Sequence, residues 1–126
     1  MGLFDPVENR SILIIDDEKE ICILLAKIIE KNGMRAIYVH SLEDALGSID
    51  KINPPLIFLD INLPDGSGID FLSRLSIQYP EIQVVIISAY DDYKTKAVEL
   101  GAIAFLIKPF SKQAVVDILS NCLNHA

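Results

Sequence analysis

Cysteine and histidine are scarce in this sequence, and tryptophan is absent. The chain has 2 cysteines and 2 histidines among 126 residues, and they form no cluster of the kind that holds zinc. Cys22 and Cys122 stand in helical apolar patterns, so we interpret both as small buried side chains in a reducing compartment. His40 and His125 are isolated in the sequence, and neither is predicted to act as a ligand or in phosphoryl relay.

Basic residues and long apolar runs are also lacking. The 11 lysines and arginines are outnumbered by 18 acids, and the net charge of −7 argues against nucleic acid as a direct partner. The longest apolar run, residues 82–89, contains Gln83 and is far shorter than the ~20 residues that cross a bilayer. No charged-then-apolar leader opens the chain, so we expect a cytoplasmic protein with no membrane partner.

The length and composition indicate one folded domain. Hydrophobic residues make up 51% and charged residues 23%, which is unlike a disordered chain. Residues 1–9 show no period and contain Pro6, so we expect an N-terminal lead-in followed by a single domain over residues 10–126.

Short apolar runs alternate with helical patterns along the chain. Strands are predicted at residues 11–15, 35–39, 56–59, 84–87 and 103–107. Helices are predicted at residues 18–32, from Ser41 through 49, 69–77, 91–100 and from Ser111 through 122, and residues 62–68 are predicted to form a loop. This alternation predicts an α/β fold, a doubly wound five-stranded parallel sheet with helices on both faces.

An acid, a hydroxyl or an amine directly follows four of the five predicted strands. Ligands of open α/β sheets bind at the carboxyl ends of the strands, and the residues there are Asp16, Asp17, Asp60, Ser88 and Lys108. Neighbouring carboxylates repel unless a cation neutralises them, and an all-oxygen donor set suits Mg²⁺. A lysine and a hydroxyl suit phosphate oxygens, and a carboxylate can itself attack phosphorus. Asp60 is the central candidate because it lies between the other groups in strand order.

These residues fall into motifs that resemble a known family. The motifs are Asp16-Asp17, Asp60-Ile61-Asn62-Leu63-Pro64 with Gly68 beyond it, Ser88-Ala89 and Lys108-Pro109-Phe110. In order and spacing they resemble the receiver domain of two-component response regulators over roughly residues 10–124. The resemblance implies the flavodoxin-like (βα)5 receiver fold of the chemotaxis regulator, with strand order 2-1-3-4-5.

The resemblance also implies roles for the site residues. Asp60 would accept a phosphoryl group from a phosphohistidine on a sensor histidine kinase or a histidine phosphotransfer protein. Asp17, Asp60 and the backbone carbonyl of Asn62 would ligate Mg²⁺ directly, and Asp16 would act through a bound water. Lys108 would pair first with the acid and then with the phosphoryl group.

A conformational switch and an output surface are implied as well. Ser88 would hydrogen-bond the phosphoryl group while Phe105 rotates with it, and the Lys108–Pro109 bond would be cis. The partner surface would comprise helix 91–100, strand 103–107 and the helix from Ser111. It would serve an effector, a fused output domain or a homodimer formed on activation. Either a stand-alone receiver or a piece of a longer protein is expected, and the piece is favoured.

Two other functions are open at this point. A Mg²⁺-dependent phosphatase with an aspartyl-phosphate intermediate would need a general acid two residues after its nucleophile, where this chain has Asn62. A receiver could instead bind partners without phosphorylation. In the leading interpretation the domain is no enzyme beyond promoting its own phosphorylation and hydrolysis. We expect Tyr90 and Asn62 to tune the access of hydrolytic water.

Overall fold

Five short, mainly apolar runs form the central strands of the computed structural model, which describes residues 10–123. The strands are β1 (Ser11–Ile15), β2 (Arg35–Val39), β3 (Leu56–Asp60), β6 (Gln83–Ser88) and β7 (Ala104–Ile107). The helices are α1 (Lys19–Lys31), α2 (Leu42–Ile52), α3 (Gly68–Gln78), α4 (Lys94–Glu99) and α5 (Lys112–Cys122). The predicted lead-in over residues 1–9 and His125 lie outside the described residues.

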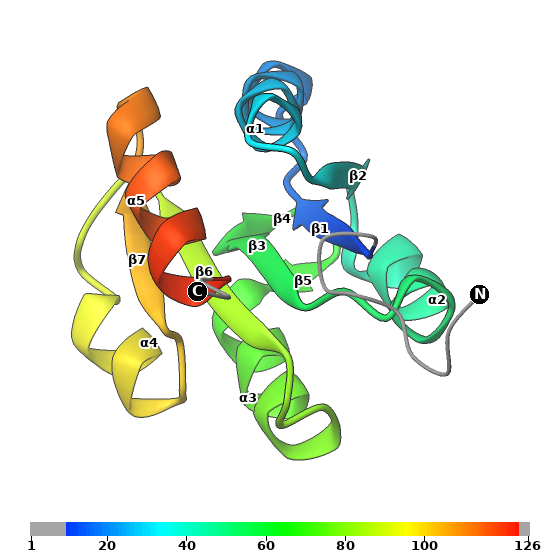
Figure 1. The fold of residues 1–126 in the computed structure, drawn as a ribbon. Helices are drawn as coiled ribbons and strands as arrows, with labels where there is room; N and C mark the ends of the chain where they lie inside the picture. The colour runs from blue at the N-terminus through cyan, green and yellow to red at the C-terminus, as the bar shows by residue number, and fades with distance from the viewer. Residues whose placement is uncertain (1–9, 124–126) are drawn as a thin grey trace.

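The five strands run parallel in the order β2-β1-β3-β6-β7 (Figure 1). Counted among these five, the order is 2-1-3-4-5, so the predicted fold class and topology are confirmed. The register aligns Ile15 of β1 with Leu59 of β3, and Asp60 of β3 with Ile87 of β6. The carboxyl ends of neighbouring strands therefore finish at the same edge of the sheet.

Alternate strand residues point to opposite faces, and each face has its own apolar core. Leu13, Leu59 and Ile86 pack with residues of α2, α3 and α4 on one face. Ile14 and Phe58 pack with residues of α1 and α5 on the other. Both faces of the three inner strands, β1, β3 and β6, are covered, and these strands are almost entirely buried, as is usual for parallel sheets. No helix within residues 10–123 has both the length and the apolarity to span a membrane.

The structure differs from the predicted elements in two places. Helix α4 is shorter than the predicted 91–100, since Tyr93 provides no side-chain cap and Ala97 is its single buried residue. The predicted loop over residues 62–68 contains a small antiparallel hairpin of β4 (Asn62–Leu63) and β5 (Gly66–Ser67). The predicted caps Ser41 and Ser111 are confirmed, because their side chains accept from the amides of Asp44 and Ala114.

The hairpin returns the chain to the end of β3, where Gly68 packs against backbone. A Cβ atom at Gly68 would lie 2.2 Å from the carbonyl oxygen of Asp60. The Gly68 amide also donates to the carbonyl oxygen of Ile61 at 2.7 Å. A side chain at this position would therefore displace the backbone that carries Asp60.

We expect Gly68→Ala to destabilise the fold by about 1–3 kcal/mol, because the overlap is with backbone and not with a flexible side chain. Gly47→Ala is the matched control, since a Cβ atom there meets nothing within 4 Å and lies in the middle of α2. That control should be neutral or stabilising by up to about 1 kcal/mol. Urea unfolding measures both, and equal stabilities of the two variants would contradict the steric argument.

Candidate functional site

Three carboxylates converge at the carboxyl edge of the sheet. Asp16 and Asp17 directly follow β1, and Asp60 is the last residue of the adjacent strand β3. One oxygen from each of the three lies within 4.8 Å of the others. Asp16 and Asp60 are buried and Asp17 is exposed, so the cluster opens to solvent on one side.

Lys108 brings a positive charge to this cluster from the far strand β7. Its backbone amide donates to the carbonyl oxygen of Ser88 at 2.8 Å, which anchors the residue beside β6. Its Nζ atom lies 3.1 Å from Asp16 Oδ2 and 3.4 Å from Asp60 Oδ2, and it also pairs with Glu18. The peptide bond from Lys108 to Pro109 is cis, as the sequence resemblance implies.

The donor set fits a small hard cation. Asp16 Oδ2 is buried, and despite its 3.1 Å distance to Lys108 Nζ no well-directed hydrogen bond satisfies it. Among residues 10–123, Lys108 is the one lysine that pairs with Asp16 and Asp60, and Asp17 lies beside these two acids. The cluster therefore carries an excess of negative charge. Carboxylate oxygens without nitrogen or sulfur donors are the ligands that Mg²⁺ prefers. The backbone amide of Asn62 donates to Asp60 Oδ1 at 3.2 Å, so Asn62 lies beside the acid.

The excess charge changes the titration of Asp60. Burial, followed by the charge of Asp16, raises the pKa of Asp60 from 3.8 to about 6, against the opposing effect of Lys108. Burial lowers the pKa of Lys108, but its contacts with Glu18 and Asp16 and the charge of Asp60 outweigh this, so the net shift is upward. The lysine therefore stays charged, and Asp60 takes up a proton at a higher pH than an ordinary aspartate does.

The predicted switch residues lie on β6, which pairs with β3, and on β7, which pairs with β6. Ser88 ends β6 and is buried, and its Oγ atom accepts a hydrogen bond from the Tyr90 amide at 3.1 Å. Phe105 pairs with Ile86 in the sheet and packs against the core under α3 and α4. Tyr90 is 71% exposed, which puts its ring in solvent.

The structure adds three residues to the site that sequence reasoning missed. Glu18, the residue after the acid pair, reaches Lys108. Cys22 Sγ and His40 Nδ1 both contact the backbone carbonyl oxygen of Asp16. The sequence indicated an isolated His40, and the structure places it beside the acid pair. A signal for His40 was present, because it directly follows β2 and strand ends of a parallel sheet meet at one edge.

Fold and site together define a class of protein. Strand order 2-1-3-4-5 has its topological switch point between β1 and β3, and the acidic cluster lies at that point. The chain is thus a small doubly wound α/β domain with a cluster of acids at the carboxyl edge of its sheet.

Comparisons with known proteins narrow this class to a family. Residues 12–120 match the model of the response regulator receiver domain. Sporulation initiation phosphotransferase F of Bacillus subtilis is 33% identical over 117 residues, which cover 91% of this chain and 94% of that protein. Nitrogen assimilation regulatory protein NtrX of Azorhizobium caulinodans is 40% identical over 119 residues, but these cover 90% of this chain and only 26% of that protein.

A solved structure agrees with these matches. The crystal structure of the receiver domain of NtrX from Brucella abortus superposes with a TM-score of 0.84 at 31% identity, covering 91% of this chain and 99% of that one. The chain belongs to the response regulator receiver domain family, whose general property is phosphorylation on an aspartate.

The raised pKa of Asp60 predicts a pH-dependent gain in stability for Asp60→Asn in metal-free buffer. Between the ordinary value of 3.8 and the folded value of about 6, the folded state binds more protons than the unfolded state, so stability falls as pH rises. The variant should exceed wild type by on the order of 1–3 kcal/mol at pH 8, and the gap should narrow toward pH 4.

Urea unfolding across this pH range measures the difference. Asp92→Asn, at an exposed acid outside the cluster, is the control and should show no such trend. If the difference in stability between Asp60→Asn and wild type is the same at pH 4.5 and pH 8, the raised pKa of Asp60 is refuted.

Proposed function

We propose that this domain is a phosphoacceptor that receives a phosphoryl group on Asp60 from the phosphohistidine of a sensor histidine kinase or histidine phosphotransfer protein. The observation that carries the proposal is the placement of a buried carboxylate between an acid pair and a lysine, at the switch point of a receiver fold. A bond from an Asp60 oxygen to phosphorus forms as the donor's phosphorus–nitrogen bond breaks. The donor imidazole leaves with that electron pair.

In this proposal the acids prepare the site for Mg²⁺. Asp17, Asp60 and the Asn62 carbonyl would hold the ion, and the unsatisfied Oδ2 atom of Asp16 supports contact through a bound water. The bound ion would neutralise the charge that accumulates as phosphate oxygens approach Asp60. Lys108 supplies the second positive charge, since its Nζ atom already lies 3.4 Å from Asp60 Oδ2.

Ser88 and Phe105 would convert the modification into a change of shape. The Ser88 hydroxyl would donate to a phosphoryl oxygen, and movement of Ser88 would open space that the Phe105 ring fills. A shift from mostly off to mostly on requires about 5.5 kcal/mol of differential interaction between the two states. Charge-assisted hydrogen bonds from Ser88 and Lys108 are the source we propose for it.

The proposed catalysis is limited to the domain's own phosphorylation and dephosphorylation. Small phosphodonors would modify Asp60 when Mg²⁺ is present, and water would later remove the group. Tyr90 and Asn62 would tune the access of that water. Tyr90 is exposed and comes two residues after Ser88, and the backbone amide of Asn62 donates a hydrogen bond to Asp60. Two free cysteines, Cys22 and Cys122, support a reducing, cytoplasmic location.

The output surface is proposed on α4, β7 and α5, for an effector, a fused output domain or a second copy after activation. Apolar side chains that are about half exposed on α4 and β7 or directly before them support it, namely Tyr93, Val98, Ile103 and Ile107. Helix α4 has a single buried residue, so it is the element that would move at the lowest cost. Direct binding of nucleic acid or membrane by this domain is not part of the proposal.

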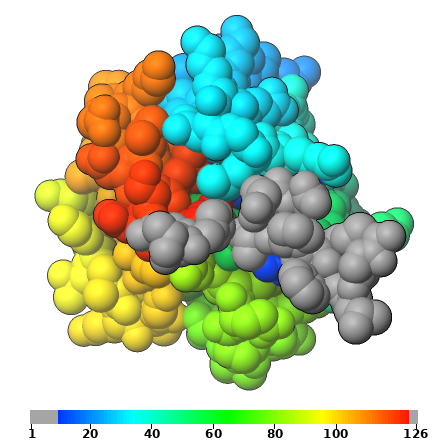
Figure 2. All heavy atoms as spheres, in the orientation of Figure 1, coloured from blue at the N-terminus to red at the C-terminus, as the bar shows by residue number. Residues whose placement is uncertain are grey.

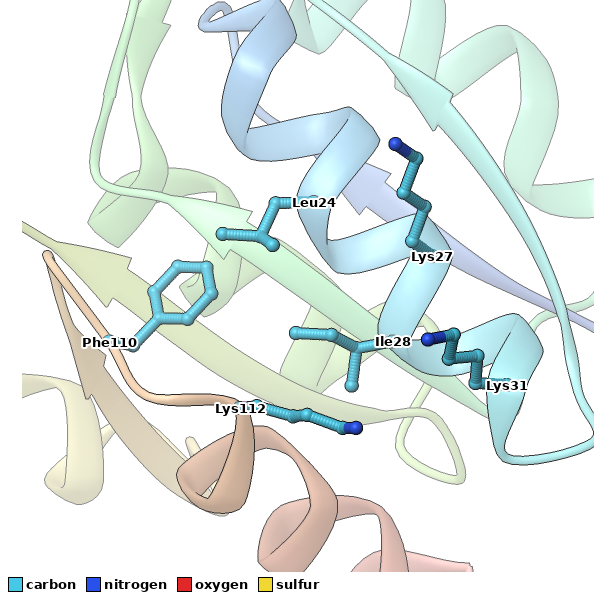
Figure 3. A pocket seen from close by; sticks show the side chains of 6 residues that line it. All are labelled: Leu24, Lys27, Ile28, Lys31, Phe110 and Lys112. Carbon is cyan, nitrogen blue, oxygen red and sulfur yellow. The ribbon is translucent and has the colours of Figure 1, made fainter.

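A groove between α1 and α5 is the docking surface we propose for the phosphodonor. The two helices lie against one another on this face (Figure 2). The groove encloses about 260 Å³ and is lined by Leu24, Ile28 and Phe110, with Lys27, Lys31 and Lys112 around them (Figure 3). Phe110 is two residues from Lys108, so the groove adjoins the site. An acidic amphipathic helix would match its apolar base and its basic rim.

Acetyl phosphate tests the acceptor. Wild type in Mg²⁺ should gain the mass of one phosphoryl group, and beryllofluoride, the phosphoryl mimic, should shift amide NMR signals around Ser88 and Phe105. Asp60→Ala should show neither effect, and chelation of Mg²⁺ should abolish both. Continuous turnover of many equivalents would favour the phosphatase, and modification of Asp60→Ala would refute the acceptor.

Leu24→Ala tests the docking surface. It should slow phosphoryl transfer from a protein donor about 5- to 30-fold, as expected when an interface anchor is removed, while modification by acetyl phosphate is unchanged. Leu46→Ala is a matched control, since Leu46 on α2 is 42% exposed and Leu24 is 45% exposed. Equal effects of the two variants on protein-donor transfer would contradict the groove as the docking site.

A further inference from the structure

Two side chains from different elements converge on one backbone oxygen at the edge of the acidic site. His40 Nδ1 lies 2.9 Å from the carbonyl oxygen of Asp16, and Cys22 Sγ lies 3.3 Å from the same atom. The two side chains are 3.9 Å apart at these atoms. Cys22 is fully buried on α1, and His40 is half-buried where β2 ends.

Both contacts have a definite direction. A carbonyl oxygen only accepts hydrogen bonds, so the proton of the His40 ring must be on Nδ1. For the same reason the Cys22 thiol is the donor in its contact with this oxygen. The carbonyl of Asp16 therefore has two side-chain donors.

This carbonyl belongs to the peptide group that joins Asp16 to Asp17. Two further polar groups of Asp16 are held too, because its amide donates to the carbonyl oxygen of Val39 at 3.1 Å and its Oδ1 atom accepts from the Glu18 amide at 2.8 Å. Rotation of the peptide plane would turn the Asp17 side chain relative to Asp60. The donors thus fix the one backbone unit on which the geometry of the acid pair depends.

We propose that His40 and Cys22 are positioning residues that hold the Asp16–Asp17 peptide so that both carboxylates face a shared Mg²⁺. The inference rests on the proposed function, because it assumes that the acidic cluster binds the ion. Groups that orient metal ligands from behind commonly contribute 10- to 100-fold to metal affinity. We therefore expect a loss of about 10-fold when either donor is removed.

The test compares variants that remove or retain each donor. His40→Leu and Cys22→Ala remove the hydrogen bonds, whereas His40→Asn and Cys22→Ser keep an N–H or O–H group near the same position. Cys122→Ser is the control, because this second cysteine lies on α5. Mg²⁺ affinity is measured by the shift of the Asp17 amide NMR signal, and thermal unfolding without metal checks that each variant is folded.

We expect Mg²⁺ to bind His40→Leu and Cys22→Ala about 10-fold more weakly, His40→Asn and Cys22→Ser to recover most of the affinity, and Cys122→Ser to match wild type. In metal-free protein, the carbonyl ¹³C shift of Asp16 should move in the two donor-removing variants only. Unchanged affinity or equal loss in the donor-retaining variants would overturn the inference. If wild type does not bind Mg²⁺, the proposed function is overturned instead. In that case an unchanged ¹³C shift of the Asp16 carbonyl would still refute the hydrogen bonds from His40 and Cys22.

Discussion

The central constraint of this molecule is the burial of like charges around Lys108. Asp16 is fully buried and Asp60 is 5% exposed, and both point at one ammonium group. Taking carboxylates out of water is costly unless each is paired, and one lysine does not neutralise two buried acids and Asp17 beside them. Two features agree with this incomplete neutralisation: the pKa of Asp60 is raised, and the Oδ2 atom of Asp16 has no hydrogen-bond partner.

The protein folds in spite of this repulsion, and the excess negative charge favours the binding of a cation at the site. A divalent ion would remove the repulsion between the acids, and a phosphoryl group would then restore a negative charge for Lys108 and Ser88 to meet. The affinity for these groups therefore arises from charge that the fold leaves uncompensated. The fold can sustain this local cost because an apolar core lies on each face of the sheet.

The parallel order of the strands brings these groups together. Residues far apart in the chain become neighbours because β1 and β3 are adjacent and their ends are in register. Lys108 directly follows the edge strand β7, and the hydrogen bond from its backbone amide to the carbonyl oxygen of Ser88 holds it near the other site residues. Gly68 lets the chain pass close to the Asp60 carbonyl, so the hairpin after β3 can close on the site. Each of these contacts depends on where the backbone of the strands and the hairpin lies.

The sequence by itself determined the element order, the parallel sheet and the residues at the strand ends, because periodicity and strand-end polarity are local properties of a chain. Asp16, Asp17, Asp60, Ser88 and Lys108 could be named from it, and the fold brings the three acids and Lys108 into one cluster. Only the tertiary structure decided that Glu18, Cys22 and His40 belong to that cluster, that α4 is short and that a hairpin follows β3. These features arise from contacts between elements distant in sequence, and no local pattern encodes the geometry of such contacts.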